Sequence, residues 1–408
     1  MHKPFLKQHG PHPFAQIVFF FAVWLLCYHT LAGGTLLAPN IYDSYSLQAQ
    51  SWLTGRMDLE TGAHYSWLEL AIFDGRYYVS FPPLPSVVCL PFVALVGAAS
   101  VPANLLCAIY LVCAAAGVYR AFCITGHSAE ISTFWATALV FAGNGLELAR
   151  MGGVWNQAQL LNLALCCWGV AAFFANRRSS SLFCFALAVG CRPFSALFLI
   201  LTFLLFYRQD RLAGKSHYAF LQSLWPGLLG TALIAAVLMW YNFVRFGSPF
   251  EFGHNFLPEF VQSTHGQFNL VYLWQNLCNI FRPVTLNSGL ALQFPRFDGF
   301  LFLLANPVFI IFFIHLARPA PKPLQLLRWA AAAGFALNLL ALCMHKTFGG
   351  WQFGARYTVD LLPYALLFLA REPQRPVRWW EKDLCAFGLL FNAFGSIYMM
   401  LDSRHFFR

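Results

Sequence analysis

A carboxylate directly after the first apolar segment is the strongest candidate for chemistry in this chain. Asp43 lies between the apolar run 14–31 and the stretch 44–53, where apolar residues recur at helical spacing. An ionised, fixed carboxylate beside a bilayer is the group that a general base needs to remove a proton from a hydroxyl. Asp also caps helix N-termini well. The two roles are compatible, because a capped carboxylate stays ionised and is held in place.

Asp43 belongs to an acidic stretch, residues 40–85, in a chain with only sixteen acidic residues. The other acids of this stretch are Asp58, Glu60, Glu69 and Asp74. We expect the first two to be solvated. Glu69 and Asp74, which precede Tyr78, are candidate auxiliary or acceptor-binding groups together with that tyrosine, and a solvated loop position is the alternative for both acids. Either acid together with Asp43 would also allow a divalent metal, although nothing in the sequence requires one.

A glycine-rich segment, residues 345–357, carries the complementary charge. Its three glycines let the backbone approach a ligand closely. Arginine matches phosphate oxygens with two parallel hydrogen bonds, so Arg356 is a candidate phosphate ligand. The candidate donor-phosphate group comprises Arg356, Lys346, His345 and Tyr357. The alternative is an ion pair between Arg356 and Asp360, four residues apart at a helix start.

Arg192 is the only charged residue between Ser179 and Tyr207. An ionisable residue inside a membrane is a functional candidate, because burying its charge is costly. The alternative is a position near the surface, at the tip of a hairpin formed by residues 181–206.

The elements that must position these residues are membrane-spanning helices. The 408 residues are 59% hydrophobic and only 10% charged, whereas a soluble domain carries about 25% charged residues. The composition predicts an all-α polytopic membrane protein, one domain over residues 1–408, with about 10–13 spans. Runs without Asp, Glu, Lys or Arg cover residues 8–42, 77–119, 131–146, 151–176, 179–191, 193–207, 216–244, 299–317, 329–345 and 384–401.

The net charge of +10 reflects basic residues scattered over short loops. This is the distribution of cytoplasmic loops under the positive-inside rule, and it argues against a nucleic-acid partner. The twelve cysteines show no metal-ligand spacing, and we expect buried free thiols. The first apolar run is longer than a signal-peptide core and is interpreted as a retained span.

Three loops are predicted outside the membrane: 34–82, 243–298 and 345–356. The tail with His2, Lys3 and Lys7 is predicted in the cytoplasm. The stretch 44–53 is predicted to be an amphipathic helix lying in the interface, with Tyr45 and Ala49 on its apolar face and Ser44 and Gln48 opposite. Further predictions are a break near residues 97–102, a re-entrant or tilted segment at 131–146, and crossings at 218–242, 299–317 and 326–344.

With these residues assembled, the chain resembles the GT-C superfamily of membrane glycosyltransferases. The resemblance is closest to the bacterial branch similar to protein mannosyltransferases and aminoarabinose transferases. Its motifs follow in order along most of the chain: Asp43-Ser44-Tyr45 to Arg56, Gly75 to Pro83, Arg192-Pro193, Asn242 with Phe246 to Pro249, and Gly354-Ala355-Arg356-Tyr357 to Pro363.

The resemblance implies a GT-C bundle that moves a sugar from a polyprenyl-phosphate carrier to a hydroxyl of a glycan, lipid or protein. It implies Asp43 as catalytic base and Arg356 as a contact to the carrier phosphate. It also implies a bacterial inner membrane with the site on the periplasmic side. Two features depart from the family pattern. Some relatives have a phosphate-binding Lys where Ser80-Phe81 precede the second span, and no C-terminal domain follows the last apolar segment. We therefore expect the loop 243–298, with Phe250, Glu251, His254, Asn255, His265 and Arg282, to bind the acceptor.

Three alternatives remain open at this point: a transporter or flippase for lipid-linked sugars, a ligase or polymerase acting on polyprenyl-diphosphate glycans, and a GT-C-like scaffold without activity. A transporter would more often show internal repeats and polar residues at mid-membrane depth. The sequence instead concentrates its polar residues at one membrane edge.

Overall fold

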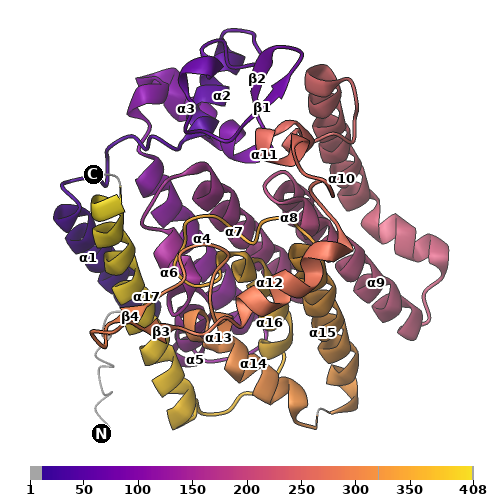
Figure 1. The fold of residues 1–408 in the computed structure, drawn as a ribbon. Coiled ribbons are helices and arrows are strands. Elements are labelled where there is room, and N and C mark those ends of the chain that lie inside the picture. The colour runs from indigo at the N-terminus through magenta and orange to yellow at the C-terminus, as the bar shows by residue number, and fades with distance from the viewer. Residues whose placement is uncertain (1–11, 320, 407–408) are drawn as a thin grey trace, which may run out of the picture.

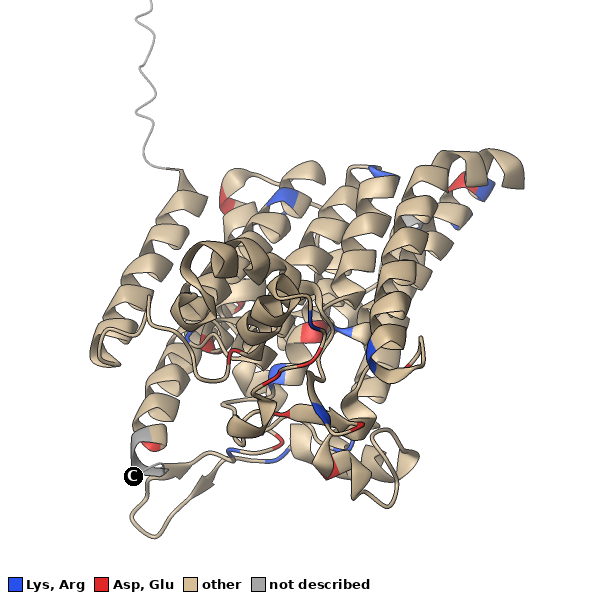
Figure 2. Cartoon of the chain, turned by 90° about the horizontal axis from the view of Figure 1, so that it is seen from above, with Lys and Arg blue, Asp and Glu red and all other residues tan. Residues whose placement is uncertain are grey.

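The chain folds as a bundle of helices with almost no sheet, as the composition predicts (Figure 1). The structure is a computed structural model and describes residues 12–319 and 321–406. The tail residues predicted to be cytoplasmic, His2, Lys3 and Lys7, lie outside the described residues. The positions of Lys, Arg, Asp and Glu lie mostly near the ends of the helices and in the loops (Figure 2). The chain is an integral membrane protein.

The first half of the described chain holds ten α-helices and one strand pair. They are α1 (Pro13–Leu31), α2 (Ser44–Leu53), β1 (Leu70–Phe73), β2 (Arg76–Val79), α3 (Leu84–Val96), α4 (Ala103–Ile124), α5 (Ala129–Ala136), α6 (Asn144–Leu148), α7 (Val154–Phe174), α8 (Arg178–Val189), α9 (Ala196–Leu212) and α10 (His217–Phe246). The strands pair antiparallel, with Leu70 opposite Val79. This hairpin, α2 and α3 lie at one end of the bundle, at the top of Figure 1.

The second half begins with a long loop that carries only short elements. The elements of this second half are α11 (Pro258–Val261), α12 (Leu273–Ile280), β3 (Thr285–Leu286), β4 (Leu292–Gln293), α13 (Phe302–Ala305), α14 (Val308–Ala317), α15 (Lys322–Cys343), α16 (Leu362–Leu369) and α17 (Trp379–Phe406). Single helical turns complete the chain: η1 (Gly62–His64), η2 (Ala98–Ser100), the π-turn η3 (Thr137–Phe141), η4 (Pro193–Ser195), η5 (His254–Phe256), η6 (Leu270–Tyr272) and the longer η7 (Arg356–Leu361).

Six described helices are long and apolar enough to cross a membrane: α1, α4, α7, α10, α15 and α17. Four shorter apolar helices accompany them: α3, the segment Ala129–Phe141, α8 and α14. The four shorter helices fall below the length of about 20 residues that a single crossing needs, so the described residues hold six full-length candidate spans where 10–13 were predicted. The crossing predicted at 299–317 is wrong as a single helix. It divides into α13 and α14 at Asn306-Pro307, because proline ends the preceding helix.

Two irregular places in the bundle agree with the sequence predictions. The apolar run after β2 breaks at Gly97, whose φ of 76° ends α3. The hairpin predicted over 181–206 is present as α8 and α9, joined through η4, where Pro193 follows Arg192. In the segment 131–146 helix α5 runs into the π-turn η3, and its re-entrant or tilted orientation in the membrane stays a prediction.

Helix α2 forms where the periodicity predicted it, but its environment differs from the prediction. Tyr45 and Ala49 are buried as expected, yet Ser44 and Gln48 of the opposite face are buried too. The amide oxygen of Gln48 accepts a hydrogen bond from the Ser86 hydroxyl of α3 at 2.7 Å, and its amide nitrogen bonds the Tyr241 hydroxyl of α10. Because these neighbours satisfy the polar face, α2 packs against protein on its polar face as well as on its apolar face.

Candidate active site

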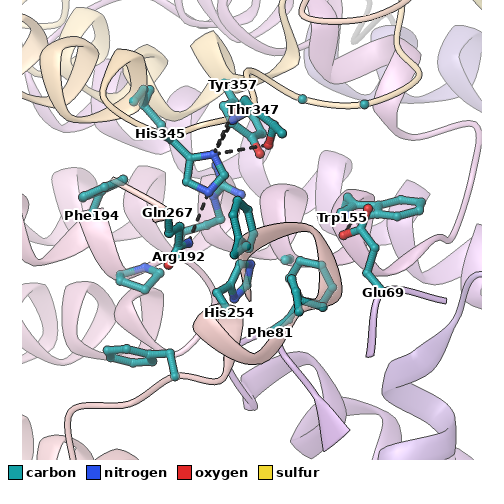
Figure 3. Close-up of a pocket in the computed structure, with 18 of the residues that line it drawn as sticks. Glu69, Phe81, Trp155, Arg192, Phe194, His254, Gln267, His345, Thr347 and Tyr357 are labelled. Carbon is teal, nitrogen blue, oxygen red and sulfur yellow. Dashed lines mark hydrogen bonds between the residues drawn. The ribbon is translucent and has the colours of Figure 1, made fainter. Parts of the chain in front are cut away.

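A cavity of about 640 Å³ lies where several distant segments meet on the side of the β1–β2 hairpin (Figure 3). Its walls come from the start of α7, the hairpin tip between α8 and α9, the long loop 252–268, and the segment after α15. Sequence-predicted residues on its surface are Glu69, Arg192, His254, His345, Arg356 and Tyr357. The structure thus brings together residues that are up to 288 positions apart, and it gives the cavity both a cationic and an acidic part.

Arg356 is the least compensated charge of this cavity. Its side chain is buried, and its Nη1 has no hydrogen-bond partner among the described residues. The alternative pairing with Asp360 is not formed. Burial lowers the pKa of the guanidinium from its usual value, although nearby Tyr357 opposes the shift. A buried cation with an unpaired N–H that borders a cavity is arranged to receive an anion.

Arg192 lies at the tip of the α8–α9 hairpin, and it takes Asp360 as its partner. Its Nη2 lies 2.8 Å from Asp360 Oδ2, and Nε donates to the same oxygen at 3.0 Å. The guanidinium carbons of Arg192 and Arg356 each lie 4.9 Å from the ring centroid of Tyr357. The phenol ring therefore holds two cations in one wall by cation–π attraction, one paired and one not.

The backbone that carries Arg356 is fixed by two side-chain amides, one from α7 and one from the segment after α15. Gln159 of α7 donates to the carbonyl of Arg356 at 2.7 Å, and the Arg356 N–H donates to Gln352 at 2.8 Å. Gly354 has a φ of 82°, and a Cβ there would lie 2.4 Å from the amide nitrogen of Asn144. Glycine is required at that position both for its conformation and for the close contact.

His345 also lines the cavity, whereas Lys346 does not. The Nδ1 of His345 lies 2.7 Å from the carbonyl of Thr347, and Nε2 lies 3.2 Å from the Gln267 amide nitrogen. Burial lowers the pKa of His345 to about 4, so the ring is neutral at pH 7. Lys346 donates to the backbone carbonyl of Glu259 at 2.5 Å. Through these contacts the two residues hold the segment after α15 against the long loop 243–298.

Asp43 caps α2, as its position in the sequence predicts. Its Oδ1 accepts hydrogen bonds from the Ser46 N–H at 3.2 Å and the Gln157 amide at 2.7 Å, and its Oδ2 accepts from the Ser46 hydroxyl at 2.5 Å. Burial raises its pKa, and these three donors oppose the rise. Asp43 does not line the cavity; it lies behind α7, whose Trp155 and Ala158 do.

Glu69 is the carboxylate that does face the cavity. It immediately precedes β1, and its Oε2 accepts a hydrogen bond from the indole N–H of Trp155 at 2.9 Å (Figure 3). Asp74 and Tyr78 are not brought to the cavity. Asp74 is exposed in the β1–β2 turn with a φ of 49°, and Tyr78 packs in a separate cluster with Phe246. Of the described residues, no three or more of His, Cys, Asp and Glu are grouped to hold a metal ion.

The loop 243–298 contributes fewer of its expected residues than the sequence suggested. His254 lines the cavity, with Nδ1 2.7 Å from the Ser80 carbonyl, and burial lowers its pKa to about 3. The remaining candidates do not line the cavity: Phe250, Glu251, Asn255, His265 and Arg282. Sequence reasoning missed Trp155, Glu259 and Asp298, which do. Glu259 and Asp298 could have been proposed from their charges in the loop 243–298. Trp155, at the start of an apolar run, offered no such indication.

No protein-family model matches the chain, and no curated protein matches its sequence. Solved structures resemble its fold. ArnT from Cupriavidus metallidurans bound to undecaprenyl phosphate has a TM-score of 0.52 and 13% identity, over 87% of this chain and 60% of that one. The oligosaccharyltransferase of Archaeoglobus fulgidus has a TM-score of 0.55 and 14% identity, over 98% and 56%. AglB, an archaeal oligosaccharyltransferase from Archaeoglobus fulgidus in complex with an inhibitory peptide and a dolichol-phosphate, has a TM-score of 0.52 and 14% identity, over 93% and 56%.

The GT-C fold expected from the sequence is confirmed by these similarities. The chain spans less than two thirds of the length of the solved proteins that it resembles.

Proposed function

We propose that this protein transfers a sugar, a hexose or a pentose, from a polyprenyl-phosphate carrier to a hydroxyl acceptor at the outer face of the membrane. The observation that carries the proposal is the buried, unpartnered Nη1 of Arg356 beside a cavity. Two of the similar structures hold undecaprenyl phosphate and a dolichol-phosphate, which supports a lipid phosphate as the ligand.

The cavity suits a ligand that is anionic at one point and apolar along its length. Arg356 supplies the charge for the phosphate, and Tyr357 and His345 stand beside it as further contacts. Phe81, Pro82, Phe194 and Leu342 give apolar wall surface, on which prenyl units would lie. Lys346 adds positive charge to the same loop without touching the cavity.

In the proposed reaction a single displacement occurs at the anomeric carbon. The acceptor oxygen forms a bond to that carbon while the bond from the carbon to the phosphate oxygen breaks, and the electron pair leaves with the lipid phosphate. The carrier changes from a phosphodiester monoanion to a phosphomonoester dianion, whose added charge Arg356 stabilises. The acceptor proton goes to Asp43. The anomeric configuration is inverted.

Asp43 suits the base role chemically, because burial raises its pKa toward the working pH. For it to reach the acceptor hydroxyl, the acceptor must approach from the side of α2 and α7, where Gln157 now holds the carboxylate. Glu69 and Arg192, which line the cavity, remain proposed auxiliary groups, whereas Asp74 and Tyr78 lie away from it. We place the acceptor among glycans, lipids and proteins, and the protein in a bacterial inner membrane with the site on the periplasmic side.

Substitution of Asp43 by Asn tests the base. Amide and carboxylate have the same shape, so α2 keeps a cap, while general-base catalysis is worth about 10²- to 10⁴-fold. With purified protein and undecaprenyl-phosphate sugars, we expect kcat to fall by about that factor. Asp383→Asn, at an exposed position of α17, is the matched control and should transfer normally. Unchanged transfer by Asp43→Asn would remove Asp43 from the mechanism.

A further inference from the structure

Glu69 and Trp155 form a small polar subsite within the cavity. One carboxylate oxygen, Oε2, is fixed by the indole N–H at 2.9 Å. No cation pairs with the carboxylate in the part of the chain that the structure describes, and the side chain is open to the cavity. Desolvation by the surrounding protein atoms raises the pKa of Glu69, and the nearby charge of Glu259 adds to the rise. The hydrogen bond from Trp155 and the charge of Arg356 oppose it. The second oxygen, Oε1, is thus available to a ligand.

The subsite is held rigidly by two elements. Glu69 directly precedes the paired strand β1, and its backbone carbonyl accepts a hydrogen bond from the Ser80 hydroxyl at 3.3 Å. Trp155 stands in the first turn of α7, and its ring lies 5.7 Å from the ring of Tyr42. Since the Tyr42 carbonyl also accepts the N–H of Val154 at 3.0 Å, the start of α7 is tied to the residue next to Asp43.

The cavity therefore has two chemically different parts. Glu69 and Trp155 lie on one side of the view in Figure 3, and Arg192, His254 and His345 lie on the other. A half-buried indole offers an apolar face, and a carboxylate beside it offers strong acceptors for O–H groups. That combination fits a ring that has apolar C–H faces and hydroxyls along its edge, which is the chemistry of a sugar.

We propose that the Glu69–Trp155 subsite binds the sugar ring of the lipid-linked donor, with ring hydroxyls donating to Glu69 and the ring face against Trp155. This inference rests on the proposed function and specifies how that function distinguishes a glycosylated carrier from a bare one. In a sugar phosphate a single oxygen links the phosphorus to the ring. A phosphate on Arg356 therefore places its sugar in the same cavity, toward the acidic part.

Binding of two kinds of lipid separates this subsite from the phosphate site. The probes are undecaprenyl phosphate alone and its glucosyl, mannosyl, galactosyl and arabinosyl esters, measured by microscale thermophoresis with the full chain in detergent. Wild-type protein should bind at least one ester about tenfold more tightly than the bare lipid phosphate. Hydrogen bonds to a charged group are each strong enough for that difference.

Glu69→Gln retains a carbonyl oxygen that can accept the Trp155 N–H, so the local fold should persist. We expect it to reduce the gain from the sugar to less than threefold while bare lipid phosphate binds within twofold of wild type. Trp155→Phe should reduce the gain in the same way, because Glu69 loses its fixed orientation. Glu60→Gln, on the exposed part of the same outer loop, is the control and should behave as wild type.

Three results would overturn the subsite: no ester binds more tightly than the bare lipid phosphate, Glu69→Gln weakens both kinds of lipid equally, or Glu69→Gln changes neither. In each of these cases lipid-phosphate binding that depends on Arg356 would still stand. If wild-type protein binds none of the lipids, the proposed function fails and the subsite fails with it.

Discussion

Replacing Arg356 with methionine separates a ligand-binding arginine from a structural one. The substitution removes the charge but keeps an unbranched stem in the wall. The proposed role gives Arg356 two charge-assisted hydrogen bonds to the departing phosphate, each worth about 1.5–3 kcal/mol. Their loss corresponds to a fall in kcat/KM of roughly 10²- to 10⁴-fold, since about 1.4 kcal/mol is a factor of ten.

The same substitution should leave the stability of the protein intact. A structural arginine loses bonded partners when it is replaced, whereas Nη1 of Arg356 has none among the described residues. The shorter, uncharged side chain would forgo the cation–π contact with Tyr357, worth about 1 kcal/mol, and would relieve the burial of a charge, which costs more. We therefore expect an apparent melting temperature equal to or above that of wild type.

Transfer of radiolabelled sugar from undecaprenyl-phosphate donors and intrinsic-fluorescence melting in detergent give the two readouts. Arg208→Met, at an exposed position near the end of α9, is the matched control and should change neither. A fall in melting temperature that accompanies the loss of transfer would refute the reasoning, because it would show that Arg356 supports the fold. Full activity would refute the phosphate role itself.

Two further outcomes follow from the charges around the cavity. Asp360→Asn leaves the largely buried guanidinium of Arg192 without its counter-ion, and we expect the free energy of unfolding to fall by about 3 kcal/mol, measured by thermal or denaturant unfolding. The double variant Asp360→Leu with Arg192→Met should recover most of this loss. Equal losses in the two variants would contradict the ion-pair account. The pKa of His345 is lowered to about 4 from an ordinary 6.5, so the unfolded chain takes up a proton at this residue before the folded protein does. The free energy of unfolding is therefore unaffected by this residue above pH 6.5. It falls by up to about 1.4 kcal/mol per pH unit as pH drops from 6.5 toward 4. Between pH 6.5 and 4 the melting temperature of His345→Gln should depend less on pH than that of wild type. An unchanged pH dependence would exclude His345 as its source.

The sequence was informative where local spacing decides the structure. Asp43 followed by a helical repeat predicted α2 and its cap, because capping depends only on neighbours in sequence. The run 181–206 was predicted as a hairpin from charge at both ends, and Pro193 provides the break. The wrong prediction for α2 concerned its polar face. Gln48 is satisfied by Ser86 and Tyr241, and periodicity alone does not disclose partners at such separations.

Individual residues of the candidate site were predictable from the sequence, but their ion-pair partners were not. Arg356 was predicted to bind phosphate from its glycine-rich surroundings. The alternative interpretation paired it with Asp360, because the two are four residues apart at a helix start. In the structure Asp360 takes Arg192, 168 positions away, and this leaves Arg356 uncompensated. The distribution of charge in the cavity depends on that choice of partner. Similarly, the sequence predicts that Asp43 caps a helix, but only the fold shows that Glu69, and not Asp43, lines the cavity.

The pairing of Asp360 also bears on the transporter alternative. A transporter that exposes its binding site alternately to the two sides of the membrane needs polar groups along the transport path that can exchange partners. Deeper in the bundle, Asn144, Asn306 and Thr358 bond to one another: the amide of Asn306 donates to Asn144 Oδ1 and to the Thr358 hydroxyl, each at 3.0 Å. Arg192 is likewise committed to Asp360. The unpartnered Nη1 of Arg356 and the open carboxylate of Glu69 both belong to one cavity, an arrangement that favours chemistry at one membrane edge over passage through the bundle.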